Sequence, residues 1–217
     1  METLTDLLLR SKYKNRLVTP ETISRLLTGS SARQWGLLNR ALKSGELLKL
    51  KRGLYLLSST VTGAEISRFS IANRMVPGSY ITQETALGYY GWLSEEPLLI
   101  QSCIGNGRSR VFNNTFGEFS YERIPVTGKN FLEGVNRIHS SHANILIASL
   151  ERALGDTISR RNFEWHGIVG ICEQLRTDVS NIYGLDLKTL RELSGVYRSR
   201  KTNAFLLNLV HALGGER

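Results

Sequence analysis

The sequence has few cysteines and no long apolar run, and both absences limit what the protein can be. Its two cysteines, Cys103 and Cys172, are too few for a disulfide framework or a four-ligand metal site. We therefore expect two structural thiols in a reducing compartment. No run of about 18 uncharged apolar residues occurs, so no membrane-spanning helix is expected. The first residues place acids before a short apolar run and lack a cleavage-like site, which argues against a signal peptide. We expect a cytoplasmic protein with no membrane partner.

Motifs of the common catalytic sites are also lacking. There is no phosphate-binding loop of the G-x-x-x-x-G-K-[ST] type, no nucleophile elbow and no D-x-D pair. His139 and His142 have no cysteine or acid cluster beside them, so no metal site is expected. Glu151 and Asp156 could form a catalytic acid pair, but an intrahelical ion pair that includes Arg152 is the favoured interpretation. We therefore expect no enzyme activity, no metal and no cofactor.

Positive charge is abundant, and it is concentrated near the start of the chain. The 217 residues carry a formal net charge of +9. Residues 1–60 hold 11 lysines and arginines against 4 acidic residues, which accounts for +7 of this charge. A localised positive field suits a polyanion, because each phosphate that is neutralised releases condensed counterions. A basic face can equally be a solubilising surface, so charge alone does not decide the partner.

Two helix starts near residues 20 and 30 predict a helix-turn-helix. Thr19 can cap free N–H groups, and Pro20 suits the first helical position. Gly29 ends this helix, and Ser30 or Ser31 caps the next one. Helical spacing predicts a buried face on the second helix made of Trp35, Leu38, Ala41 and Leu42. A basic two-stranded hairpin follows, with Gly53 at its tight turn.

The residues expected to contact DNA lie on the second helix and on the hairpin. Arg33, Gln34 and Arg40 are expected to read or flank bases, since Arg can bond guanine and Gln can bond adenine in two places. Phosphate contacts are expected from Ser30 and Ser31, where a helix start favours anions, and from the basic residues Lys43, Lys49, Lys51 and Arg52.

The remaining chain predicts a second, larger domain. The small polar segment 58–63 is the expected hinge, so the predicted domains are 1–60 and 61–217. Strands are expected near 79–81, 97–104, 110–112, 116–124 and 143–148, with helices over 64–75, 82–90, 150–158, 165–181, 187–195 and 200–213. The predicted fold class is α+β: an N-terminal winged helix-turn-helix followed by a mixed α+β domain that ends in helices.

Three stretches resemble one known family. SARQWGLLNRALKSGELLKLKRGLYLL (residues 31–57) resembles the winged helix of AbiEi-type antitoxins, with the wing motif at Gly45 to Tyr55. PGSYITQETALGYYGWLSEEP (residues 77–97) and IASLERALGDTI (residues 147–158) are similar to two further motifs of that family. The second stretch departs from the family pattern at Thr85, where Ser is usual, and at Trp92, where Leu is common.

The resemblance implies a two-part regulator. Such a protein is a DNA-binding repressor of its own operon that binds operator repeats. It is also a type IV antitoxin, used in phage defence by abortive infection, that counteracts a nucleotidyltransferase-like toxin without a stable complex. The residues leave alternatives open: a stand-alone regulator, or a protein-interaction module whose basic face meets an acidic partner.

Overall fold

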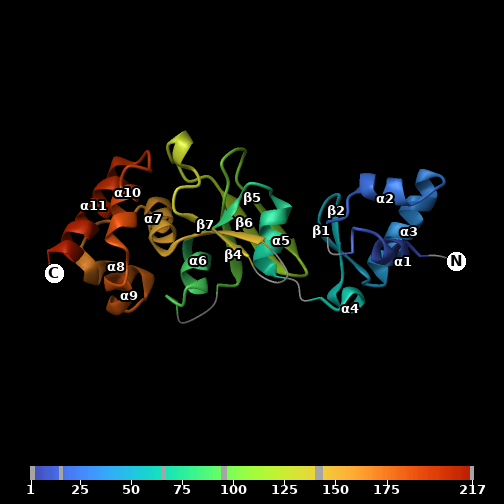
Figure 1. Ribbon diagram of the computed structural model, residues 1–217, viewed down its shortest axis with the longest axis horizontal. Coiled ribbons are helices and arrows are strands. Elements are labelled where there is room, and N and C mark those ends of the chain that lie inside the picture. Colours follow the sequence, from blue (N-terminus) through green and yellow to red (C-terminus); the bar gives the residue numbers. More distant parts are fainter. Residues whose placement is uncertain (1–2, 15–16, 65–66, 94–96, 140–143, 216–217) are drawn as a thin grey trace.

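The chain forms an elongated α+β molecule whose two ends lie far apart (Figure 1). The computed structural model describes residues 3–14, 17–64, 67–93, 97–139 and 144–215. Helices and a hairpin occupy the N-terminal end, a mixed sheet lies in the middle, and four helices close the C-terminal end (Figure 1). In the described part of the chain, no helix combines the length and the apolar character needed to cross a membrane.

The first three helices begin where side chains satisfy the free N–H groups of the first turn. The helices are α1 (Leu4–Arg10), α2 (Pro20–Leu26) and α3 (Ser31–Lys43). The hydroxyl groups of Thr3, Thr19 and Ser30 each accept a hydrogen bond from a backbone N–H three residues later. The helix start expected at Thr19 is confirmed, and of the two serines expected to cap the next helix it is Ser30 that does so. Gly29 takes the positive φ of 106° at the turn between the two helices.

A two-stranded hairpin follows α3. Strands β1 (Leu47–Lys51) and β2 (Leu54–Leu57) pair in antiparallel fashion, and Gly53 forms the turn at φ 71°. An antiparallel bridge between Val18 and Tyr55 adds the segment before α2 to the second strand. The hairpin that the sequence predicted is confirmed.

Strand β2 is buried on both of its faces. Successive strand residues point to opposite sides. Tyr55 and Leu57 join the apolar cluster of the three N-terminal helices, whereas Leu54 and Leu56 join the larger cluster of the rest of the chain. All four side chains are at most 8 % exposed. The hairpin is thus shared between the two cores.

The segment expected to be a hinge is a short helix. Helix α4 (Ser59–Thr62) begins at the cap residue Ser58 and ends at Gly63, whose φ of 67° is left-handed. Small polar residues can cap and fill one helical turn as well as they can form a loop, so composition alone did not separate the two.

A six-stranded mixed sheet forms the centre of the molecule. Its strand order is β5-β6-β4-β3-β8-β7, with β4 parallel to β6 and β3 parallel to β8. The other neighbours are antiparallel. The strands are β3 (Tyr80–Ile81), β4 (Leu99–Cys103), β5 (Arg110–Asn114), β6 (Gly117–Glu122), β7 (Val135–His139) and β8 (Asn144–Ala148).

Helices pack on this sheet, and further helices continue from it to the C-terminal end of the molecule (Figure 1). One helix expected over residues 165–181 is two helices, because the chain turns at Arg176 with a φ of 53°. The helical elements are α5 (Arg68–Met75), α6 (Gln83–Tyr89), the 3-10 turn η1 (Gly128–Asn130), α7 (Leu150–Arg161), α8 (Gly167–Leu175), α9 (Val179–Tyr183), α10 (Leu187–Leu193) and α11 (Arg200–Gly214).

Candidate nucleic-acid interface

Helix α3 presents a wide polar face to solvent. Leu38 and Ala41 are buried against the neighbouring helices and β1. At 3.6 residues per turn, the opposite side of the helix carries Ala32 and Gly36. The same side holds the exposed polar residues Arg33, Asn39, Arg40 and Lys43.

The centre of this face carries only small residues, and the space above it is open. A β-carbon built on Gly36 would meet no atom within 4 Å, and Ala32, one turn earlier, has only a methyl group. Helix α3 contains no acidic residue. The result is a shallow, positively charged helix surface whose backbone another molecule can approach closely.

Trp35 does not lie where its spacing predicted. It is 53 % exposed, and its ring borders a small hollow with Pro20, Ile23 and Leu38. The prediction that Trp35 is a core residue is therefore wrong. The helix α2 beside it has only seven residues, and a partner of that length leaves the start of α3 partly uncovered.

The residues at the start of α3 are exposed, and some of them form hydrogen bonds within the turn between α2 and α3. The hydroxyl of Ser30 accepts the backbone N–H of Arg33 at 3.4 Å, while Ser31 is the first helical residue. The Arg33 guanidinium reaches back to the carbonyl oxygen of Thr28 at 3.5 Å. Both serines and Arg33 remain exposed.

Gln34 is tied into the turn between α2 and α3. Its side-chain amide donates to the carbonyl oxygen of Leu27 at 3.2 Å, and its side-chain oxygen accepts the hydroxyl of Ser24 at 2.9 Å. The side chain is half-buried. This geometry suits a residue that holds the two helices together, and it leaves little of the amide free for a base.

The three basic residues of the hairpin do not share one environment. Lys49 and Arg52 are exposed, whereas Lys51 is half-buried. The ammonium group of Lys51 donates to the carbonyl oxygen of Met75 at 2.6 Å and lies 5.5 Å from the centre of the Phe112 ring. Burial lowers the pKa of Lys51, and the nearby charge of Arg110 lowers it further. Lys51 therefore packs against the larger apolar cluster, whereas Lys49 and Arg52 remain in solvent.

Asn39 is the polar residue of this face that sequence reasoning missed. It is exposed and lies three residues after Gly36 and four before Lys43. The available signal was its position on the side opposite Leu38 and Ala41. An asparagine side chain can bond adenine in two places in the major groove, so Asn39 replaces Gln34 as the better-placed amide.

Helix α7, which carries Glu151, Arg152 and Asp156, contributes to a buried network. The Arg152 guanidinium and the Asp156 carboxylate are fully buried and joined by a 2.9 Å bond. Asp156 also accepts hydrogen bonds from the hydroxyls of Tyr80, Thr82 and Tyr197 at 2.6–3.0 Å. The Nη1 group of Arg152 donates to two backbone carbonyl oxygens, and its Nη2 group donates to the Tyr80 hydroxyl at 2.7 Å. The intrahelical ion pair is confirmed.

Burial sets the acid–base behaviour of this network. It raises the pKa of Tyr80 and of Tyr197 well above the usual value, and the charge of Asp156 acts in the same direction. Burial is the largest single influence on Arg152 and lowers its pKa, but the electrostatic interactions with Asp156, Tyr197 and Tyr80 and the hydrogen bond to Asp156 together outweigh burial and raise the pKa. Arg152 and Asp156 each make several hydrogen bonds and are closed to solvent, which is typical of a structural network.

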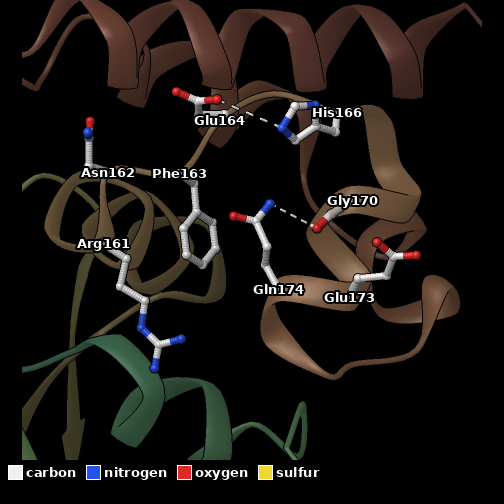
Figure 2. A pocket seen from close by; sticks show the side chains of 8 residues that line it. All are labelled: Arg161, Asn162, Phe163, Glu164, His166, Gly170, Glu173 and Gln174. Carbon is white, nitrogen blue, oxygen red and sulfur yellow. Dashed lines mark hydrogen bonds and ion pairs between the residues drawn. The ribbon is translucent and has the colours of Figure 1, made fainter.

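A hollow between α7 and α8 is polar but of mixed charge. Its volume is about 540 Å³, and Figure 2 shows Glu164, His166, Glu173 and Gln174 around it. Arg161 points away and pairs with Glu84, while Glu164 pairs with Lys201 at 3.3 Å. No group of three metal-binding side chains occurs among the residues with described positions. His142 of the rejected histidine pair lies outside them, and His139 bonds Asn144 at 2.8 Å.

Comparison with known proteins bears on the fold alone. No protein-family model and no curated protein sequence matches the chain. Among solved structures, the chain is similar to the RV2827C protein from Mycobacterium tuberculosis, with a TM-score of 0.61 at 16 % identity. The match covers 97 % of this chain and 77 % of that one. The likeness supports an α+β arrangement that extends over nearly the whole chain.

Proposed function

We propose that this protein binds double-stranded DNA in a sequence-specific way through an N-terminal winged helix-turn-helix. The observation that carries the proposal is the exposed face of α3, where Ala32 and Gly36 are surrounded by longer polar side chains and no acid. Small residues allow the helix to lie deep in the major groove, and arginine and asparagine are chemically suited to base edges.

The remaining basic residues divide into roles by their surroundings. Arg33, Asn39 and Arg40 would read or flank bases. Lys43, Lys49 and Arg52 are exposed and would contact phosphates together with Ser30 and Ser31 at the helix start. Lys51 and Gln34 would support the geometry from within, because each is already hydrogen-bonded inside the protein.

The first test is DNA binding by the purified full chain. About 6 phosphate contacts give a log–log slope near −5 between affinity and salt concentration. We expect tight, salt-dependent binding to the promoter of the chain's own gene, measured by fluorescence anisotropy, and much weaker binding to a scrambled duplex. Equal affinity for both duplexes, or a flat response to salt, would contradict the proposal.

Variants separate base reading from phosphate contact. Asn39→Ala should cost about 1–3 kcal/mol at the promoter and relax the sequence preference, whereas Arg52→Ala should weaken all duplexes alike and reduce the salt slope by about 1. Lys188→Ala, an exposed lysine of α10 outside this face, is the matched control and should leave binding unchanged. If Asn39→Ala and Arg52→Ala act identically, the assigned reader is wrong.

We further propose that the chain represses its own operon and acts as a type IV antitoxin in the cytoplasm, with residues 61–217 carrying the antitoxin activity. The support is the resemblance of three stretches to AbiEi-type antitoxins. The expected neighbour is a gene for a nucleotidyltransferase-like toxin. Co-expression should restore growth of cells that produce this toxin, without co-purification of the two proteins. If the toxin stays lethal in the presence of this chain, the antitoxin proposal fails and the stand-alone regulator is the remaining alternative.

A further inference from the structure

A second cavity lies beyond the carboxyl ends of two central strands. Strands β4 and β6 are parallel neighbours, and the segments that follow them, 104–106 and 123–126, form one side of the cavity. The turn η1 and Arg198 close the other side. The volume is about 710 Å³, within the range of small-molecule sites. In open α/β sheets, ligands commonly bind beyond the carboxyl ends of parallel strands.

The cavity is positively charged and holds no compensating acid. Its charged side chains are Arg123 and Arg198, and no lining residue of the described chain is acidic. Arg123 is exposed and makes no hydrogen bond or ion pair with any residue whose position is described. The Nε atom of Arg198 donates to the carbonyl oxygen of Val126 at 3.1 Å. This bond orients the guanidinium and leaves its two terminal nitrogens for a ligand.

An aromatic ring lies in the same cavity. Phe131 is half-buried and packs against Tyr80 with ring centres 5.2 Å apart. A β-carbon built on Gly105 would lie 3.6 Å from the Phe131 ring. The absence of a side chain at Gly105 therefore leaves that part of the ring uncovered on the cavity side.

We propose that this cavity binds a nucleoside diphosphate. Each of the two guanidinium groups in the lining can bond a phosphate group through two parallel N–H···O bonds. The Phe131 ring offers an apolar surface on which a base can stack. The site is separate from the exposed face of α3, so this inference goes beyond the proposed DNA binding and does not rest on it.

The test is calorimetric titration of the purified full chain with ADP, with inorganic phosphate and adenosine as single-part probes. We expect saturable binding of ADP at one site per chain, and much weaker binding of either part alone. Absence of saturable ADP binding would overturn the proposal. Inorganic phosphate that binds as tightly as ADP would show an anion site without a nucleoside, which would overturn it too.

Variants locate the site. Arg123→Ala and Arg198→Ala should each weaken ADP by about tenfold or more, because each removes charged hydrogen bonds to phosphate. Gly105→Leu should also weaken ADP binding, because the new side chain would cover the Phe131 ring. The control Arg191→Ala removes an exposed arginine from α10 and should bind ADP normally. Circular dichroism of each variant verifies the fold.

DNA affinity, measured on the same variants, distinguishes this site from the proposed α3 interface. Arg123→Ala should leave the affinity for promoter DNA unchanged. If Arg123→Ala weakens DNA and not ADP, or if Arg191→Ala weakens ADP equally, the cavity is part of a general polyanion surface and the proposal fails.

Discussion

The ion pair of Arg152 and Asp156 is the most demanding residue-scale feature of the core. Both side chains have 0 % relative exposure, and three hydroxyl groups from distant parts of the chain converge on the carboxylate. Thr82 occupies the N-cap position of α6, where a threonine hydroxyl usually accepts a backbone N–H of the first turn. Here the hydroxyl donates to Asp156 and caps no N–H of the helix. The network orders β3, α7 and the segment before α11 relative to one another.

Asp156→Asn should therefore destabilise the protein strongly. The change leaves a buried guanidinium without its counter-charge, which costs about 3–5 kcal/mol. Urea unfolding followed by circular dichroism measures it. Glu164→Gln breaks exposed ion pairs and should cost less than about 1 kcal/mol. Similar losses for the two variants would mean that the buried pair is no more important than the surface pairs.

Cys103 should make stability depend on alkaline pH. Burial raises its pKa to about 11 from the usual 9.0, and the charge of Asp156 adds to the rise. A raised pKa gives stability that is complete below pH 9 and is lost as pH rises through 11. Between pH 8 and 10.5, the thiol should account for a loss of about 2 kcal/mol in the free energy of unfolding.

The measurement compares urea unfolding at the two pH values for the native chain and for Cys103→Ala. The native chain should lose about 2 kcal/mol more than the variant, because tyrosine titration is common to both. Cys172→Ala is the comparison, since burial also raises the pKa of that half-buried thiol and its removal should change the pH dependence less. Identical pH dependence in the native chain and Cys103→Ala would contradict the shifted pKa.

Among the secondary-structure elements, the hairpin of β1 and β2 decides how the two cores are joined. Asn114 of β5 donates to the carbonyl oxygen of Leu50 at 3.1 Å, and Lys51 bonds the end of α5. These contacts bind the hairpin to the sheet and to α5.

Leu56→Ala and Leu57→Ala should both be destabilising although the residues point in opposite directions. Leu56 is 5 % exposed in the larger cluster and Leu57 is 1 % exposed in the smaller one. Removal of either should cost about 2–5 kcal/mol, measured by urea unfolding. Leu98→Ala, at an 86 % exposed leucine, is the control. A Leu56 variant as stable as the Leu98 variant would show that the hairpin face toward the sheet contributes little.

Local chemistry was readable from the sequence, and long-range contacts were not. Cap residues and turn glycines act on their immediate neighbours, so Thr19, Ser30 and Gly53 predicted the starts of α2 and α3 and the hairpin turn. Strand β7 was missed because it is an edge strand with polar residues at most positions. Lys51 was expected in solvent because its partner, the carbonyl oxygen of Met75, lies 24 residues away.

In the candidate sites too, local features were predictable from the sequence and long-range ones were not. The basic character of α3 was visible in the sequence, whereas the open space above Gly36 requires the packed helix. The cavity is lined by Arg123 and Arg198, which lie 75 residues apart in the sequence, so residue spacing could not predict it. Charge composition located the positive field near the start of the chain, whereas the cavity of Arg123 and Arg198 is visible only in the fold.

For the whole molecule, the shared hairpin predicts cooperative unfolding. Two cores that hold opposite faces of one strand cannot separate without exposing apolar surface of that strand. A Trp92→Phe, Trp165→Phe chain keeps Trp35 as the fluorescent probe of the N-terminal helices. Its fluorescence should change at the same urea concentration as far-ultraviolet circular dichroism of the whole chain. Two distinct midpoints would show that the cores unfold independently.

The doubly buried strand β2 also limits how this protein can be divided or recombined. A cut after Ser58 would leave Leu50, Leu54 and Leu56 facing water, since their partners lie in the larger cluster. The freed N-terminal piece would carry a new apolar patch, and such patches promote aggregation. Exchange of the N-terminal elements between related chains therefore requires a matched partner surface on β5 and α5, so we expect the two halves to be exchanged together.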